Sequence, residues 1–290
     1  MILVAGGSGN LGQRVVRLLH DVGEPVRVLT RDPERCRALP SDAVIVTGDV
    51  TVPTDVATAM RGCTGVISAI HGFAGPGAPT PERIDRDGNR VLIDAAHAIG
   101  VTNFVLLSVV GARADHPMSL HRSKFAAEEE LRRSGVPFTI VRATAFMETW
   151  VGVIGAPLTD KGFAIVFGPG TNSINFVSAR DVATLVVAAA RDRAPVGETL
   201  EIGGPTNLSF TAVAERLVHR DGKGGRIKHI PLPMLRAMSV LARPFSPAFA
   251  RKASAAVVMN TTNQTFETAR SGRLVAMPQT TLDEVLSAAC

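Results

Sequence analysis

The sequence predicts an α/β protein with a doubly wound parallel sheet of the Rossmann type and a smaller C-terminal part. Three observations lead to this fold. Apolar segments of strand length alternate with segments of helical periodicity from residue 1 to about residue 142. The apolar segments are continuous, which is typical of strands buried on both faces of a parallel sheet. A glycine-rich loop joins the first strand to the first helix.

The elements of this first part follow one another in a regular order. Continuous apolar segments predict strands at residues 1–5, 26–30, 43–47, 65–69, 103–107 and 138–142. Apolar residues at helical spacing predict the helices between them, first at Val15, Leu18, Leu19 and Val22, and then over 56–60, 84–99 and 119–134. Since right-handed crossovers join parallel strands, these helices would cover both faces of the sheet.

The alternation loosens after residue 145. Strands are predicted at residues 163–167 and 199–202, and helices at residues 182–190, 210–219 and 232–242. Ser178 and Asp181 are candidate N-terminal caps of the first of these helices. We expect residues 151–290 to form a smaller α/β part that returns strands to the main sheet.

The composition excludes several kinds of chemistry. The chain of 290 residues has no tyrosine, 12 phenylalanines and one tryptophan, so no mechanism can use a tyrosine phenol. Its three cysteines, Cys36, Cys63 and Cys290, are scattered, and no His, Cys, Asp or Glu cluster has the spacing of metal ligands. No apolar segment is long enough to span a membrane, and no signal peptide precedes the first strand. We expect a cytoplasmic protein without a metal.

Gly6, Gly9 and Gly12 form a Gly-x-x-Gly-x-x-Gly pattern between the first strand and the first helix. Glycines let the backbone turn sharply, and they let a pyrophosphate approach where a Cβ atom would be in the way. The amides at the helix N-terminus then bind the phosphates. A purely structural turn is the alternative, but the flanking strand and helix favour dinucleotide binding.

The end of the second predicted strand favours NADP(H) over NAD(H). An acidic residue about 20 positions past the glycine loop would bind the ribose diol of NAD. Here the strand ends in Thr30-Arg31, and the planar guanidinium of Arg31 suits a 2′-phosphate. Asp32 weakens this argument, although Asp32-Pro33 also fits a helix start, and Arg35 is a second candidate phosphate contact. We expect residues 1–150 to be the NAD(P)-binding domain and residues 151–290 to bind the substrate.

Further motifs follow in order along residues 1 to about 205. They are LVAGGSGNLG at 3–12, VLTRDP at 28–33, GDV at 48–50, HRSK at 121–124, SGVPFTIVR at 134–142, FME at 146–148 and DVA at 181–183. Together they resemble the atypical short-chain dehydrogenase/reductase family, especially its NmrA-like and isoflavone-reductase-like branches. The ordered set is specific for the family and unspecific for the substrate.

The resemblance implies cofactor contacts along the glycine loop, at several strand ends and on one helix. These residues are Gly6, Ser8, Gly9, Asn10, Leu11, Gly12, Arg31, Asp49, Val50, Ala69, Ile70, Lys124, Ala143 and Phe146. Among them, Arg31 would take the 2′-phosphate and Asp49 would lie at the edge of the adenine. Lys124 would reach the nicotinamide ribose, and Ala143 and Phe146 would flank the nicotinamide.

The catalytic tyrosine of the wider superfamily is missing. The resemblance implies Tyr-x-x-x-Lys on one helix face, but Leu120 stands four positions before Lys124. Two substitutes exist: His121, whose ordinary pKa of about 6.5 suits proton transfer, and Lys124 itself, as in the isoflavone-reductase-like branch. The alternatives are a surface role for His121 and a ribose contact or an ion pair with Glu128 for Lys124. Ser108 could polarise a carbonyl or be a turn residue.

The reaction is expected to be hydride transfer to a small, fairly apolar acceptor such as a quinone, enone, imine or carbonyl. The cofactor carries that chemistry, so water could supply the proton. Six residues could form the wall of an apolar pocket, or could simply pack in the core: Phe146, Met147, Trp150, Phe163, Phe167 and Phe176. The predicted protein is an NADPH-dependent reductase, with a homodimer as one expected assembly.

Residues 216–252 contain only one acidic residue, Asp221, against the basic residues Arg216, Arg220, Lys223, Arg226, Lys228, Arg236, Arg243, Arg251 and Lys252. A solvated surface is the simplest interpretation, and the scarcity of aromatic residues argues against nucleic acid. Two other functions stay open. One is a non-catalytic NADP(H) sensor that acts through a partner. The other is a membrane-associated assembly factor with an amphipathic helix around residues 232–253, which Pro244 and Pro247 would break. No membrane partner is expected.

Overall fold

The computed structural model describes residues 1–73, 80–191, 197–267 and 279–288. The chain divides into two compact units, each described by itself below. Unit 1 is Met1–Ala143 with Ala179–Glu201, and unit 2 is Thr144–Ser178 with Ile202–Cys290. Part of the glycine- and proline-rich segment that follows the fourth strand lies outside the described residues.

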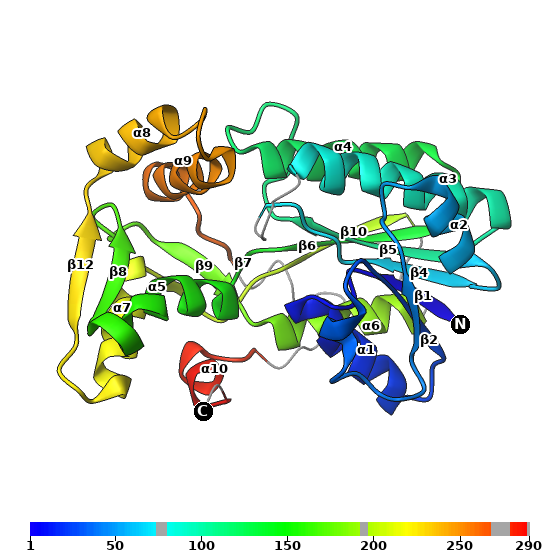
Figure 1. Ribbon diagram of the computed structural model, residues 1–290, viewed down its shortest axis with the longest axis horizontal. Helices are drawn as coiled ribbons and strands as arrows, with labels where there is room; N and C mark the ends of the chain where they lie inside the picture. Colours follow the sequence, from blue (N-terminus) through cyan, green and yellow to red (C-terminus); the bar gives the residue numbers. More distant parts are fainter. Residues whose placement is uncertain (74–79, 192–196, 268–278, 289–290) are drawn as a thin grey trace. The chain divides into compact units, whose positions relative to one another are not determined.

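Unit 1 is built on a seven-stranded sheet in the order β10-β6-β5-β4-β1-β2-β3 (Figure 1). The strands are β1 (Ile2–Ala5), β2 (Val26–Thr30), β3 (Val44–Thr47), β4 (Gly65–Ser68), β5 (Asn103–Val109), β6 (Phe138–Ala143) and β10 (Glu198–Ile202). Neighbouring strands from β3 to β6 are parallel. Strand β1 lies between β2 and β4, so the strand order reverses there, which is where ligands bind in such sheets.

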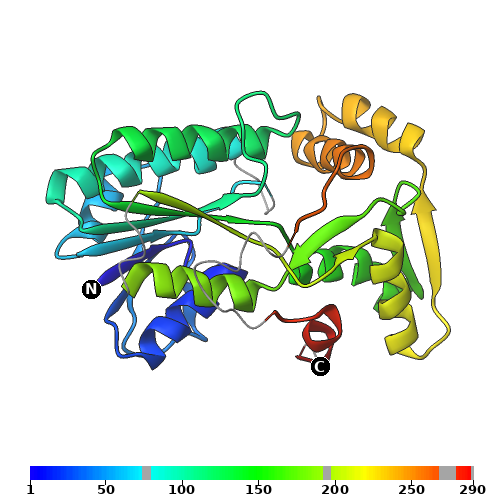
Figure 2. The same cartoon turned by 180° about the vertical axis from the view of Figure 1, so that it is seen from behind.

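Helices cover both faces of this sheet, which confirms the predicted doubly wound arrangement. They are α1 (Asn10–Asp21), α2 (Pro53–Met60), α3 (Asn89–Ile99), α4 (Ser119–Arg133) and α6 (Ala179–Arg191), with a short 3₁₀ turn η1 (Pro33–Cys36) and a π-helix η2 (Glu82–Gly88). Helices α1 and α6 pack together on one face, and α3 and α4 lie on the other, as Figures 1 and 2 show from two sides.

The core of unit 1 explains why its strands are continuous apolar segments. All four residues of β1 are buried, and so are all four of β4. Leu3, Leu92 and Phe104 join one cluster in which the sheet packs against its helices. Each central strand is covered by helices on both faces, so successive side chains on either face are apolar and do not alternate with polar ones.

Unit 2 has two small sheets, one of β7, β9 and β11 and one of β8 and β12. Its strands are β7 (Ala145–Phe146), β8 (Phe163–Phe167), β9 (Ile174–Val177), β11 (Asn207–Leu208) and β12 (Arg226–Ile230). Its helices are α5 (Met147–Lys161), α7 (Phe210–Asp221), α8 (Leu232–Leu241), α9 (Pro247–Thr261) and α10 (Leu282–Ala288). Strand β8 and helices α7 and α8 were predicted from the sequence, but α5 was not, because its Gly152, Gly155 and Pro157 are weak helix formers.

The two prolines after α8 separate two helices, as the sequence analysis expected. Helix α8 ends at Leu241, and α9 begins with Pro247 in its first turn. Proline fits there because the first helical N–H groups have no partner within the helix. Pro247 therefore starts a second helix, which the sequence analysis did not predict.

Candidate functional site

The glycine loop joins β1 to α1 and packs against the end of β4. Gly6 has a φ of +84°, and a Cβ atom there would lie 2.6 Å from the carbonyl oxygen of Ala69. A Cβ atom on Gly12 would overlap the carbonyl oxygen of Gly6 and lie 2.6 Å from the Cα atom of Gly7. Both glycines are therefore required by the loop's own backbone packing, before any ligand is considered.

Helix α1 begins directly behind this loop with its first amides unpaired. Gly9 is the N-cap and provides no side-chain cap, and the first turn carries no acidic residue. The amide of Gly9 donates to the carbonyl of Gly6, and within the described ranges those of Asn10, Leu11 and Gly12 have no hydrogen-bond acceptor. Unpaired N–H groups and the positive end of the helix dipole form an anion site, so the loop fits a pyrophosphate.

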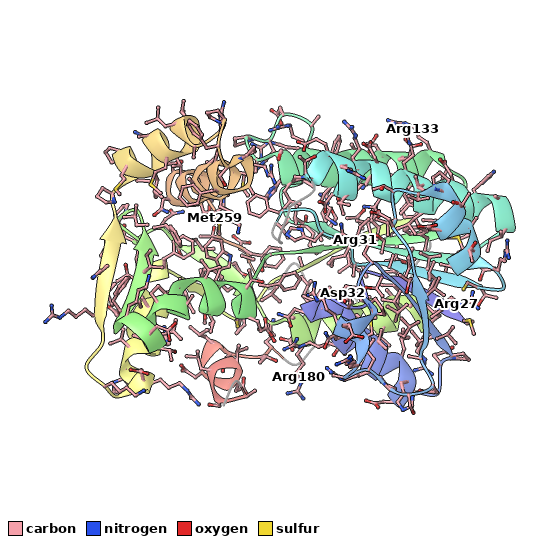
Figure 3. All side chains as sticks on the ribbon, in the orientation of Figure 1. Arg27, Arg31, Asp32, Arg133, Arg180 and Met259 are labelled. Carbon is pink, nitrogen blue, oxygen red and sulfur yellow. The ribbon has the colours of Figure 1, made fainter. Side chains whose placement is uncertain are left out.

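Two charged residues, Arg31 and Asp32, directly follow β2 and are labelled in Figure 3. Arg31 is exposed, and in the part of the chain that the structure describes no hydrogen bond or ion pair holds its guanidinium. The Oδ1 atom of Asp32 accepts the amide of Glu34 at 3.1 Å and so caps η1. Thr30 donates its hydroxyl to Ser8 at 3.1 Å, which ties β2 to the glycine loop.

Asp49 and Val50 lie after β3. The Oδ1 atom of Asp49 accepts the amide of Thr51 at 2.8 Å and the Thr51 hydroxyl at 2.9 Å. Burial raises the pKa of Asp49, but the bonds from Thr51 and the charge of Arg31 outweigh it and leave the pKa below its ordinary value. Val50 is half-buried against the core of unit 1.

Lys124 lies in the interior of unit 1, on α4. Its ammonium donates to the carbonyl of Ile70 at 3.0 Å and to the carbonyl of Leu107 at 2.9 Å. Its Nζ atom also lies 3.0 Å from the Oδ1 atom of Asp85, and both side chains are almost completely buried. Leu120, four positions earlier, is buried and apolar. Lys124 therefore joins the ends of β4 and β5 to the π-helix η2.

Asp85, which the sequence did not single out, is the buried partner of Lys124. Its Oδ2 atom accepts the amide of Gly72 at 2.8 Å, and His71 lies 3.8 Å from its Oδ1 atom. Burial raises the pKa of Asp85, but the charge of Lys124 and the contact with His71 outweigh it and hold the pKa low. The only signal in the sequence was a carboxylate beside Ile84, a predicted core position.

Glu128 does not pair with Lys124, so that alternative from the sequence is not what the structure shows. Its carboxylate accepts from Ser108 at 2.5 Å and from Arg142 at 2.6 and 2.9 Å. Arg132 donates to the same carboxylate at 3.1 Å. The Ser108 hydroxyl is buried and committed to Glu128, which leaves it a structural group rather than one that faces a substrate.

His121 stacks on His116, with ring centroids 3.8 Å apart. Burial, together with the nearby His116 and Arg113, lowers the pKa of His121 to about 3. Its Nδ1 atom is buried and has no hydrogen-bond partner within the described residues. The imidazole is thus neutral near pH 7, and the pKa of about 6.5 that suggested proton transfer does not apply.

Four other predicted contacts lie at or just after strand ends. In unit 1, the amide of Ala69 donates to Ala5 at 2.9 Å, Ile70 is buried, and Ala143 accepts from the amide of Val110 at 3.0 Å. Phe146 lies in unit 2, where it pairs with Val177 between β7 and β9.

The aromatic residues of unit 2 form part of its core. Phe176 and Phe210 are fully buried. Trp150 is half-buried and packs on Phe210, with ring centroids 4.7 Å apart, and on Phe167 at 6.4 Å. Core packing therefore accounts for Phe176, while Trp150 and Phe167 are only half-buried.

The family model of NAD(P)H-binding proteins matches residues 6–193. The chain belongs to this NAD(P)H-binding family. The predicted resemblance to the NmrA-like, atypical short-chain dehydrogenase/reductases is confirmed, and so is a nicotinamide dinucleotide as cofactor. This member of the family is an NAD(P)-dependent oxidoreductase.

Two relatives and one solved structure are similar to this member of the NAD(P)H-binding family over most of its length. The NAD(P)H azoreductase of Xenophilus azovorans is 30% identical, over 86% of this chain and 84% of its own. The photosystem II assembly factor Ycf39 of a Synechocystis strain is 28% identical, over 84% of this chain and 74% of its own. The NADPH-dependent quinone oxidoreductase QOR2 of Escherichia coli, complexed with NADPH, shares the fold with a TM-score of 0.80 at 20% identity, over 100% of this chain and 99% of its own.

Among the described residues, no three His, Cys, Asp or Glu side chains lie close enough together to hold a metal ion. Within the same residues, no helix combines the length and the apolar character that a membrane span requires.

Proposed function

We propose that this chain transfers a hydride from NADPH to a small, fairly apolar acceptor of the quinone, enone, imine, carbonyl or azo class. The observation that carries the proposal is the uncapped N-terminus of α1 behind the glycine loop, which fits a pyrophosphate. When NADPH is bound, it supplies the hydride, and the protein binds and orients it. The azoreductase relative, named for NAD(P)H, supports this class of reaction.

The free guanidinium of Arg31 supports NADPH over NADH. Arg31 follows β2 with no hydrogen bond or ion pair to its guanidinium among the described residues, while the Oδ1 atom of Asp32 already caps η1. A planar guanidinium can bind a phosphate through two hydrogen bonds. Arg35 is exposed close by in sequence and remains a second proposed contact.

Replacing Arg31 by glutamine should weaken NADPH binding about 30-fold, because a charge-assisted contact of about 2 kcal/mol is lost. NADH binding should change by less than about threefold, since NADH has no 2′-phosphate. Both dissociation constants can be measured by cofactor fluorescence. Arg133→Gln is the matched control, because Arg133 is an exposed arginine of α4 that pairs only with Glu129 in the described structure. Equal losses for both cofactors would contradict the assignment.

We further propose that the proton comes from solvent rather than from Lys124 or His121. Lys124 is buried, with two N–H groups bound to carbonyls and the Asp85 carboxylate beside it. His121 is neutral near pH 7 and therefore carries no proton that it could donate readily. The part proposed for Lys124 is to hold the ends of β4 and β5, along which the riboses would pass.

The assay is NADPH oxidation against a panel of quinones, enones, imines and azo compounds. With an accepted substrate, kcat/KM should be nearly constant between about pH 6 and about pH 9, because no side chain donates the proton in that range. The His121→Asn variant should keep kcat/KM within about twofold of the original chain. A bell-shaped profile that disappears in His121→Asn would identify His121 as the proton donor after all.

The acceptor is proposed to bind in unit 2. Trp150 and Phe167 are half-buried beside the aromatic core of unit 2, and Phe146 is half-buried in β7. Flat apolar molecules stack well on such rings.

The second candidate is a redox sensor that binds NADP(H) without turnover. The absence of tyrosine and the pairing of Lys124 with Asp85 favour it, because the usual proton donor is missing and the lysine expected at the cofactor already has a partner. Tight NADPH binding with no oxidation by any acceptor in the panel would support the sensor and reject the reductase.

A further inference from the structure

Exposed apolar side chains gather on α8, on α9 and on the turn between them. They are Met234 at 51% exposure, Val240 at 57%, Leu241 at 71%, Phe245 at 89% and Phe249 at 44%. We call these five residues the α8–α9 patch. The other large apolar residues with comparable exposure lie apart, as Val22, Val44, Val52, Ile99 and Val153 on other elements. Figures 1 and 2 show α8 packed beside α9 at the edge of unit 2.

The charge around this patch has a single sign. No Asp or Glu occurs from residue 222 to residue 266, while Arg236, Arg243 and Lys252 are exposed on the same two helices or their turn. Arg236 lies four residues before Val240, so a cation and an apolar side chain share one face of α8. An apolar face flanked by cations is the pattern of helices that lie in a membrane interface.

The backbone amides of the turn at residues 242–246 are paired within the protein. The amide of Ala242 donates to Met238, that of Arg243 to Val240, and those of Phe245 and Ser246 to Ala242. The residue between them, Pro244, has no N–H group. The backbone N–H groups of this turn are therefore already paired, so placing Phe245 among lipid chains would leave no backbone N–H group of residues 242–246 without an acceptor.

The charge and the apolar surface of the α8–α9 patch favour one kind of binding partner over others. A second copy that docked through this same patch would place like charges against each other, because no carboxylate lies in this segment. Nucleic acid would attract the cations but would leave Val240 and Leu241 against water or phosphate. An anionic lipid surface provides both negative headgroups and an apolar boundary.

We propose that the α8–α9 patch docks this protein on anionic lipid surfaces, with Leu241 and Phe245 inserted and Arg236 and Lys252 at the headgroups. This departs from the expectation of no membrane partner, and it requires no spanning helix. It does not depend on the proposed reductase activity, since none of these residues is placed in the cofactor or acceptor site.

The test is co-sedimentation of the full chain with vesicles made of equal parts of phosphatidylcholine and phosphatidylglycerol, or of phosphatidylcholine alone. The protein should sediment with the anionic vesicles and remain in solution with the neutral ones. The double variant Leu241→Ser/Phe245→Ser should reduce partitioning at least about tenfold, because both inserted side chains are lost. Arg236→Gln/Lys252→Gln should also reduce it, and high salt should weaken binding of the original chain.

Matched control variants distinguish binding through this patch from non-specific binding to vesicles. Val153→Ser removes an apolar residue of α5 that is 41% exposed, and Arg133→Gln removes an exposed cation from α4. Both should bind vesicles like the original chain, and thermal melting should confirm that every variant is folded. The proposal is overturned if the anionic vesicles do not bind the chain. It is equally overturned if Leu241→Ser/Phe245→Ser binds normally, or if that variant instead converts a dimer to a monomer.

Discussion

Replacing Gly12 by alanine should cost about 3 kcal/mol of folding stability and weaken NADPH binding at least about 100-fold. The added Cβ atom would overlap the carbonyl oxygen of Gly6 and approach the Cα atom of Gly7 to 2.6 Å. Neither contact can be relieved by a side-chain rotation, because both involve backbone atoms. Helix α1 would have to move away from the loop, and its unpaired amides would move with it.

Chemical unfolding and NADPH titration measure the two effects of Gly12→Ala separately. Gly152→Ala is the control, because a Cβ atom on Gly152 in α5 would meet nothing within 4 Å. That helix should gain up to about 1 kcal/mol, since alanine favours helix over glycine. A Gly12→Ala protein that is as stable as the original and binds NADPH equally well would show that the close packing of this loop is not required.

Replacing Asp85 by alanine should destabilise unit 1 by about 3–5 kcal/mol, because the ammonium of Lys124 would stay buried without its carboxylate. The pair is almost fully buried, with Nζ and Oδ1 atoms 3.0 Å apart. The amide of Gly72 would also lose its acceptor. Urea unfolding of the single variant measures this loss.

The double variant Asp85→Leu/Lys124→Met distinguishes a buried charge from a packing defect. Replacing both partners by apolar side chains of similar size should restore stability to within about 2 kcal/mol of the original chain, because no buried charge remains. If the double variant were as unstable as the sum of its single variants, packing and not charge would explain the loss.

The stability that Asp85 provides should also depend on pH. Its pKa in the folded protein lies below the ordinary value, so the contribution is complete above the unfolded-state pKa of about 3.9. It is lost as the pH falls toward the folded-state pKa, where the carboxylate takes up a proton. Unfolding free energies between about pH 7 and about pH 3 should therefore fall more steeply for the original chain than for Asp85→Leu/Lys124→Met.

The relatives of this chain are named for different roles. One is an azoreductase, and others are photosystem II assembly factors. The glycine loop requires Gly6 and Gly12 for its backbone packing. The proposed acceptor site and the α8–α9 patch are formed by other residues. Binding of NADPH, turnover and lipid docking are therefore separate properties, and the experiments above measure each of them independently.

The sequence by itself determined the alternating α/β order, the glycine loop and the choice of a nicotinamide dinucleotide. These features are local: a strand of continuous apolar residues, glycines where a Cβ atom cannot fit, and a helix that starts immediately afterwards. The strands at residues 26–30 and 163–167 were predicted with their observed bounds for the same reason. The less regular order of unit 2 hid α5 and α9, because glycine and proline in these helices weaken the periodic signal.

Only the tertiary structure decided what the polar residues near the predicted site do. Lys124 pairs with Asp85, which is 39 positions away, and Glu128 pairs with Arg142, Arg132 and Ser108. His121 lies against His116 and so has a pKa far from its ordinary value. Spacing along a helix determines which face of the helix a side chain lies on. Burial and partners from other elements determine its protonation state and its hydrogen-bond partners. The physical reason is that the electrostatics of a buried group depend on its neighbours in space, most of which are distant in the chain.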